Sequence, residues 1–303
     1  MNLKLKLSYI VFFFVIFFYY SAINYLTFNI NYYDFGINIS KIYKDTDIFS
    51  FILRPVLILF KPLIYIDNIF IVPFTLIFLN IIGVLMPMLF FINKKKLDLL
   101  FFLYPIIFII GTLVNSGFHT DVFYIFFGIQ NLIFFKESKY KSFVLTLIVI
   151  FILKTPLFFI HLILLFSIFY EKFIIRKNIF LFLITFISIC VLFFADFKES
   201  IYFFSHIFLL VIPFYFFLKE KLFFLLVYLF LTLIIFFINY KLLNINNHFT
   251  VVFLTFSLFL ILTNKKINFK FNNPAIIYFI FIIILNTFYF SNSIFSLRTD
   301  NLS

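Results

Sequence analysis

Six side chains of this sequence have the chemistry of a reactive or ligand-binding site: Tyr33, Asp34, Arg54, His119, Asp121 and Lys154. A carboxylate such as Asp34 can act as a general base or as a metal ligand. An imidazole such as His119 can move a proton or coordinate a metal. The guanidinium and ammonium groups bind anions, phosphate above all. These residue types could carry acid–base or anion-binding chemistry.

Each of these residues also has a plainer interpretation. Asp34 is also typical of a solvated loop acid. His119 and Asp121 stand at the start of an apolar run, where Thr120 or Asp121 can cap the free amide groups of a helix. Lys154 interrupts an apolar run, so its ammonium either snorkels to the membrane surface or meets a partner or anionic ligand. The residues alone leave these alternatives open.

Composition decides which elements position these side chains. Hydrophobic residues make up 65% of the 303 positions and charged residues 12%, which is about half the charged share of a soluble protein. We therefore predict an all-α polytopic transmembrane helical bundle, with residues 1–303 as a single integral membrane domain. The net charge of +12 lies in short clusters between apolar runs, as in cytoplasmic loops, so nucleic acid is excluded as the partner.

The apolar runs predict about eleven spans. The first, 9–26, is interpreted as a retained helix, with a cleaved signal peptide as the alternative. Residues 31–54 follow it as the first extracytoplasmic loop. The apolar segment 51–66 carries two prolines and two cations, so we expect it to lie along the outer interface or re-enter it. The other spans are 69–92, 99–114, 122–135, 142–153, 157–170, 180–194, 202–218, 222–239, 251–263 and 275–290.

This arrangement places sixteen Lys and Arg residues inside and eight outside. The positive-inside rule then predicts a cytoplasmic amino terminus and an extracytoplasmic carboxyl terminus. We expect the membrane to be the inner (plasma) membrane of a bacterium. All six candidate site residues fall on the outer face. Gln130-Asn131 within a span is predicted to hydrogen-bond across helices. The single cysteine, Cys190, excludes a disulfide within one chain.

Several short motifs, in order, resemble domain of unknown function 2079, a family of membrane proteins that is similar to the GT-C superfamily of integral-membrane glycosyltransferases. They are Tyr33-Asp34-Phe35-Gly36-Ile37, Lys61-Pro62-Leu63-Ile64-Tyr65, Tyr104-Pro105, Phe118-His119 and Lys154, within residues 30–170. The chain departs from the family at three places. Arg54 stands where the family usually has His, Gly117 where it has an acid, and Thr155-Pro156 where Glu-Asp follows the lysine.

The resemblance implies a GT-C-like fold and transfer of a sugar from a polyprenyl-phosphate donor on the extracytoplasmic face. On this hypothesis Asp34 is the base or a metal ligand, and His119 orients the acceptor or the phosphate. Arg54 and Lys154 hold the phosphate, with Asp121 and Tyr33 supporting them. The partners are membrane lipid and a lipid-linked sugar.

Other classes remain as alternatives. They are a polysaccharide-repeat polymerase or flippase, a small-solute transporter, and a non-catalytic family member, which the three departures keep open. The transporter is disfavoured because the sequence shows neither inverted repeats nor charges near mid-membrane. The sequence does not require a divalent metal, and it identifies neither the sugar, the acceptor nor the oligomeric state.

Overall fold

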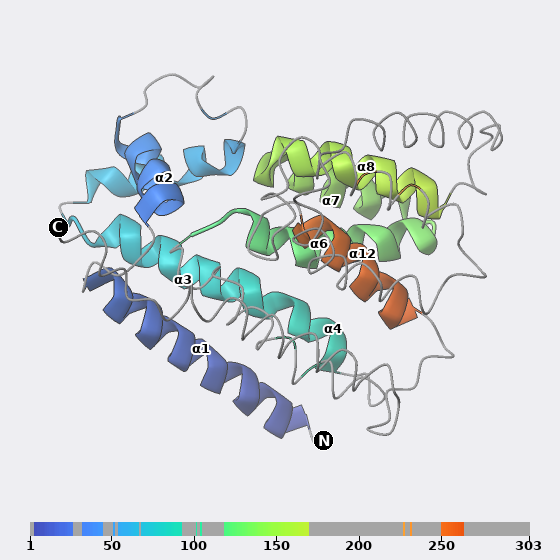
Figure 1. Cartoon of the computed structure of the whole chain (residues 1–303), viewed down its shortest axis with the longest axis horizontal. Coiled ribbons are helices and arrows are strands. Elements are labelled where there is room, and N and C mark those ends of the chain that lie inside the picture. Colours follow the sequence, from blue (N-terminus) through green and yellow to red (C-terminus); the bar gives the residue numbers. More distant parts are fainter. Residues whose placement is uncertain are drawn as a thin grey trace, which may run out of the picture. The chain divides into compact units, whose positions relative to one another are not determined.

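The computed structural model describes residues 3–26, 32–44, 51, 54–66, 68–92, 101, 104, 118–169, 227, 231 and 250–263. Every element in this part of the chain is a helix, which confirms the all-α prediction there (Figure 1). The predicted spans 99–114, 180–194, 202–218, 222–239 and 275–290 lie mainly or entirely outside the described residues, and the count of about eleven stays a prediction. The chain divides into two compact units, 1–126 with 264–303, and 127–263.

The first unit is built on two long apolar helices that run antiparallel. Helix α1 (Leu3–Leu26) contains neither proline nor glycine. Its partner comprises α3 (Ile71–Leu85), a short 3-10 turn η3 (Met86–Met88) and α4 (Leu89–Ile92). The turn begins beside Pro87, whose ring cannot continue an α-helical hydrogen-bond ladder. The region 69–92 was predicted as one span, and this broken helix fills it.

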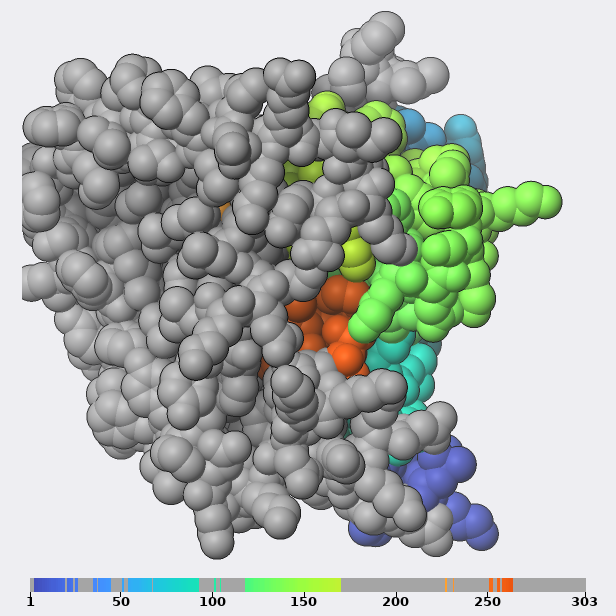
Figure 2. Space-filling model, turned by 90° about the vertical axis from the view of Figure 1, so that its right-hand side faces the viewer, coloured from blue at the N-terminus to red at the C-terminus, as the bar shows by residue number. Residues whose placement is uncertain are grey.

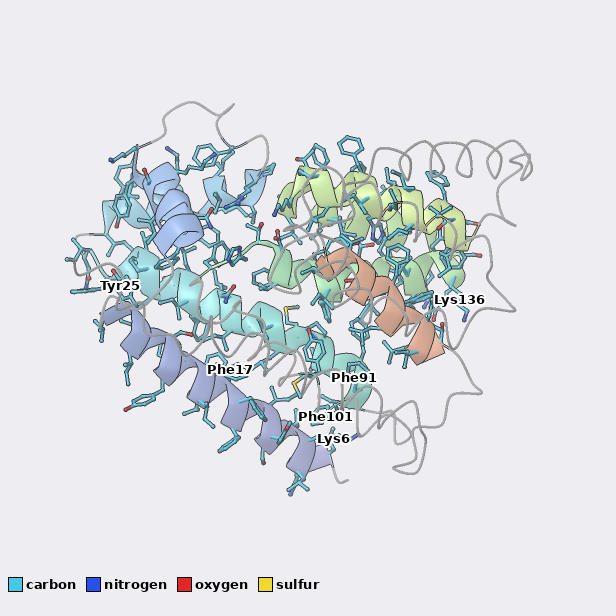
Figure 3. The ribbon with its side chains drawn as sticks, viewed as in Figure 1. Lys6, Phe17, Tyr25, Phe91, Phe101 and Lys136 are labelled. Atoms are coloured by element: carbon cyan, nitrogen blue, oxygen red, sulfur yellow. The ribbon has the colours of Figure 1, made fainter. Side chains whose placement is uncertain are left out.

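Aromatic contacts set the direction of this pair. Tyr25, near the end of α1, meets Phe74 near the start of α3, with ring centroids 5.6 Å apart. Phe14 meets Phe78, at 5.4 Å, nearer the middle of both helices. Figure 3 shows Tyr25 at one end of α1 and Lys6 with Phe91 at the other. The two helices are therefore antiparallel neighbours, as two consecutive spans of opposite direction require.

The segment between α1 and α3 is more ordered than a loop. Residues of the predicted first extracytoplasmic loop form helix α2 (Tyr32–Lys44). Its buried positions, Phe35, Asn38 and Ile42, fall on one face, whereas Tyr43 and Lys44 are exposed. This spacing is that of an amphipathic helix. A 3-10 helix, η2 (Pro55–Tyr65), follows, and its 11 residues are too few to span a bilayer, as predicted for 51–66.

Helix α6 (Asp121–Lys136) begins in the first unit and continues into the second. The second unit adds α7 (Tyr140–Leu153), α8 (Thr155–Ile168) and α12 (Thr250–Thr263). Helices α7 and α8 form a hairpin joined by the single residue Lys154. Each has 14 residues, or about 21 Å, so each is shorter than the roughly 30 Å hydrocarbon core.

Two stretches of the described chain are long and apolar enough to cross a membrane, Leu3–Ile23 with 21 residues and Ile71–Ile92 with 22. Helix α1 exposes large apolar side chains along much of its length, among them Val11, Phe12, Val15 and Leu26. Figure 2 shows part of this helix, in blue, at the molecular surface. An exposed apolar surface of this extent suits lipid better than water.

Candidate functional site

Four parts of the first unit meet in a buried cluster of hydrogen bonds, here called the Asn38 cluster. It consists of Asn38 in α2, Arg54 at the start of η2, Asn80 in α3, and the backbone of Phe118 and His119. Asn38 Nδ2 donates to the Phe118 carbonyl at 3.0 Å. Arg54 Nη1 donates to Asn38 Oδ1 at 2.6 Å, and the His119 backbone amide donates to Asn80 Oδ1 at 3.0 Å.

Asn38 is the central residue of this cluster because its amide nitrogen donates one hydrogen bond and its amide oxygen accepts another. Its side chain is fully buried. The Arg54 guanidinium can only donate, so it requires the amide oxygen, and the Phe118 carbonyl can only accept, so it requires the amide nitrogen. The orientation of Asn38 is therefore determined by the chemistry of its partners. The amide ties η2 and the segment before α6 to the same point on α2.

Backbone geometry places Arg54 at this point. Its own amide donates to the Phe51 carbonyl at 2.8 Å, and its carbonyl accepts from Leu57 at 3.1 Å. Because Pro55 follows, the helical region is disfavoured for Arg54, which has φ −142° and ψ 64°. Arg54 is half-buried. The turn thus brings a partly accessible guanidinium onto the buried amide of Asn38.

The start of α6 is the most enclosed part of the predicted site. His119, Thr120 and Asp121 are all buried, with exposures of 5%, 2% and 1%. The Thr120 hydroxyl donates to a carboxylate oxygen of Asp121 at 3.3 Å. Asp121 lies in the first turn of α6, where the helix dipole favours a negative charge. This position agrees with the alternative that Asp121 has a structural role at the helix start.

The residues at the start of α6 contact α3 near the middle of the apolar stretch Ile71–Ile92. Asn80 lies nine residues after Ile71, which is about 14 Å along the helix. Close packing supports the same register. A Cβ added to Gly83 would overlap Cγ2 of Val122 and would lie 3.2 Å from Cβ of that residue. Only glycine at position 83 lets the two backbones approach this closely. The start of α6 therefore packs against the middle of α3.

The other predicted site residues divide between the two units. Tyr33 and Asp34 lie in α2, and Asp34 is one helical turn before Asn38 in sequence. Their side chains are outside the described part of the structure. Lys154 belongs to the second unit. The first unit therefore brings together α2, Arg54 and the Phe118-His119 motif, and Lys154 is described separately.

Lys154 occupies the tip of the α7–α8 hairpin. Its backbone is extended, with φ −164° and ψ 110°, and its amide donates to the Ile150 carbonyl at 3.2 Å. Its own carbonyl accepts from Leu157 at 3.1 Å, so one residue both ends α7 and begins α8. The side chain is only 8% exposed. Lys154 lies at the carboxyl end of α7, where the helix dipole favours a cation, and at the amino end of α8, where it disfavours one.

A second buried polar cluster joins three helices of the second unit. Asn131 in α6 donates to the Phe143 carbonyl and to Thr146 Oγ1 in α7, both at 2.9 Å. Its Oδ1 lies 2.9 Å from His161 Nε2 in α8. Because the amide oxygen can only accept, Nε2 of His161 is the protonated nitrogen. The prediction that the Gln130-Asn131 pair bonds across helices is thus confirmed for Asn131.

Sequence reasoning missed three residues that hold these clusters together, Lys6, Asn38 and Asn80. Lys6 precedes the first predicted span, on its cytoplasmic side, and is only 2% exposed. Its ammonium donates to the carbonyls of Phe91 and Ile92 at 3.3 and 3.1 Å, and it lies 5.5 Å from the Phe101 ring centre. Figure 3 shows Lys6 near Phe91 and Phe101. In the sequence, each of the three is a polar residue within an apolar or amphipathic segment, and this feature could have marked them.

In the described part of the chain, no three His, Cys, Asp or Glu residues gather in a way that could hold a metal ion. The polar groups that do gather are amides, a guanidinium and backbone groups. Of these groups the Arg54 guanidinium can only donate hydrogen bonds, and it carries a positive charge. In comparisons with known proteins, no family model, no curated protein and no solved structure matches the chain.

Proposed function

We propose that the chain is a polytopic protein of the bacterial inner membrane, with about eleven spans and a GT-C-like fold. Its amino terminus is cytoplasmic and its carboxyl terminus extracytoplasmic. It transfers a sugar from a polyprenyl-phosphate donor to an acceptor hydroxyl on the extracytoplasmic face. The two long apolar helices and the exposed apolar surface of α1 support the membrane placement.

The observation that carries the proposal is the Asn38 cluster. Three of the five motifs that carry the family resemblance are far apart in sequence, namely 33–37, 61–65 and 118–119. Asn38, which follows the first motif, donates to the Phe118 carbonyl and accepts from Arg54, which precedes the helix that contains the second motif. The Phe60 and Phe118 rings also lie 5.8 Å apart. Residues that share a reaction must lie close together, and this arrangement supports the proposal for three of the five motifs.

In the proposed reaction the acceptor oxygen attacks the anomeric carbon of the donor. Asp34 takes the acceptor proton as the general base, and Tyr33 supports it. The bond between the anomeric carbon and the phosphate oxygen breaks, and polyprenyl phosphate leaves with the electron pair. Arg54 stabilises the phosphate through charge-assisted hydrogen bonds, while Asn38 fixes the plane of its guanidinium.

The remaining residues keep the roles that the family resemblance implies. His119 orients the acceptor or the phosphate, and Asp121 supports it from the first turn of α6. Lys154, in the second unit, is the second cation that the resemblance assigns to the phosphate. A lipid-linked donor diffuses in the bilayer, so its phosphate reaches these groups sideways. Membrane lipid and the lipid-linked sugar are thus the proposed partners.

The test is donor turnover by the full chain in lipid nanodiscs. Polyprenyl phosphates that carry a hexose or a pentose are supplied, and release of free polyprenyl phosphate is measured with and without sugar acceptors. Asp34→Asn is expected to lower turnover about 10²–10⁴-fold, the usual contribution of a general base. Arg54→Gln is expected to raise the KM for the donor about tenfold or more, because a charge-assisted hydrogen bond is lost.

A matched control is available on the same helix. Lys44 is exposed at the end of α2, so Lys44→Gln removes a cation without touching the Asn38 cluster, and turnover is expected to be unchanged. Full activity of Asp34→Asn would remove Asp34 as the base. Failure of the native chain to bind or turn over any donor would reject the glycosyltransferase assignment.

A further inference from the structure

The segment between α2 and α3 exposes six large apolar side chains, here called the apolar rim: Ile58, Leu59, Tyr65, Ile66, Ile69 and Phe70. Tyr65 is 86% exposed, Ile69 76% and Leu59 70%. These are among the highest exposures of any large apolar side chains in the described part of the chain. An apolar surface of this kind marks a contact with another molecule or with a membrane.

The opposite side of the same segment is fixed to the protein interior. Leu57 is fully buried, and the Phe60 ring contacts the Phe118 ring. Arg54 at the start of η2 is bound to Asn38. Figure 1 shows the 3-10 helix, in lighter blue, beside α2. The rim therefore projects from an anchored segment, and its exposure cannot be relieved by folding inward without breaking the Asn38 cluster.

Two features identify the occupant of this surface as a bilayer interface. First, the rim is continuous with a membrane-crossing candidate, because Ile71, the first residue of α3, follows Phe70 directly. Second, its chemistry is that of an interfacial anchor. A tyrosine combines an apolar ring with a polar tip, and Lys61 extends a cation over the Phe51 ring at 5.4 Å from its centre.

The length and composition of the same segment argue against its full insertion into the hydrocarbon core. Its 3-10 helix has 11 residues, contains Pro62, and carries Lys61 in addition to the half-buried Arg54. Two cations at the centre of a bilayer would be costly, whereas at the headgroup level they meet lipid phosphate. Short apolar segments with flanking cations lie in the plane of the membrane, about 5–10 Å into the headgroup and acyl boundary.

We infer that the apolar rim docks into the headgroup–acyl boundary of the outer leaflet of a phospholipid bilayer, and that this docking holds Arg54 at the depth of lipid phosphates. The inference rests on the membrane placement in the proposed function and deepens it. It assigns the route by which a lipid-linked phosphate reaches Arg54. The bilayer itself would present the donor headgroup at the level of the guanidinium.

The chain contains no tryptophan, so a single introduced tryptophan is a unique fluorescent probe of depth. Tyr65→Trp places it in the rim, and Phe12→Trp places it in the middle of α1, where the side chain is 58% exposed. Tyr43→Trp, in the exposed end of α2, is the third variant. Each full-length variant is reconstituted in vesicles of a neutral phosphatidylcholine brominated either near the glycerol end or near the methyl end of its acyl chains.

The rim probe at position 65 is expected to be quenched more strongly by the glycerol-end bromines. The probe at position 12 is expected to be quenched more strongly by the methyl-end bromines. The probe at position 43 is expected to respond mainly to aqueous iodide, since its neighbours on α2 are polar. Replacing Leu59 with Glu in the Tyr65→Trp variant should reduce the glycerol-end quenching, because it introduces a charge into the docked face.

The outcomes separate the inference from the proposed function. Suppose that the probe at position 65 responds to neither brominated lipid while the probe at position 12 does. The rim then faces water or a protein, and the inference is overturned with the membrane placement intact. If neither probe responds to brominated lipid, the membrane placement itself fails. Donor turnover is measured separately, so a rim that docks in an inactive protein would leave the inference standing and reject the enzyme.

Discussion

Replacing Asn38 with leucine is the most direct test of the cluster around which the candidate site is built. The two side chains are similar in size, so the change removes hydrogen bonds with little loss of packing. The Phe118 carbonyl loses a neutral donor, which costs about 1 kcal/mol, and the Arg54 guanidinium loses a charge-assisted bond, which costs about 1.5–3 kcal/mol. We expect the free energy of unfolding to fall by about 2.5–4 kcal/mol.

The assay is equilibrium unfolding of the purified full chain in mixed detergent micelles, followed by far-ultraviolet circular dichroism as the fraction of denaturing detergent is raised. Ser40→Leu is the matched control, because it places the same new side chain on an exposed position of α2. It should change the free energy of unfolding by less than about 0.5 kcal/mol.

A double-mutant cycle isolates the contact that matters most. The Asn38→Leu and Arg54→Met single variants are compared with the double variant, and their coupling energy is expected to be about 1.5–3 kcal/mol. A coupling energy near zero would refute the contact between the guanidinium and the amide. So would an Asn38→Leu protein as stable as the Ser40→Leu control.

The remaining predictions concern packing and the two other buried polar groups. Gly83→Ala should lower the free energy of unfolding by about 1–3 kcal/mol, because the added methyl group overlaps Val122. Lys6→Met should lower it by about 1–3 kcal/mol, because two carbonyl groups at the end of α4 lose their donor. Asn131→Leu should lower it by about 2–4 kcal/mol, since it leaves the buried N–H of His161 without this acceptor, and a second change, His161→Phe, should restore part of the loss. All three are measured by the same unfolding titration.

Each of these predictions has its own control or contradicting result. Lys4 is exposed, so Lys4→Met should leave stability within about 0.5 kcal/mol, and an equal loss for both lysine variants would contradict the burial of Lys6. A Gly83→Ala protein with unchanged stability would mean that α3 and α6 do not approach as closely as described. An additive His161→Phe effect would mean that Asn131 and His161 do not interact.

The position of α2 shows why a polar stretch resists interpretation from sequence. Residues 31–54 contain most of the early charges, and this composition predicts a loop at the membrane surface. The same stretch also places Phe35, Asn38 and Ile42 at helical spacing, and Asn38 on that face meets the Phe118 carbonyl, 80 residues later in the chain. A partner so distant in sequence could not be inferred from the local pattern alone.

The sequence by itself determined the helical, apolar character of the chain and one of the places where helices break. Runs of Phe, Ile and Leu leave no polar pattern for a strand, and Lys154 ends one helix and precedes the next where the sequence predicted a turn. The break at Pro87 was not predicted, because residues 69–92 were expected to form one span. Only the tertiary structure decided which polar residues meet. Lys6, Asn38 and Asn80 look alike in sequence, as single polar residues between apolar neighbours, and the partners of Asn131 were not predictable although its role was. Their hydrogen bonds depend on how the helices pack, because a buried polar group must find its partner on whichever backbone lies beside it.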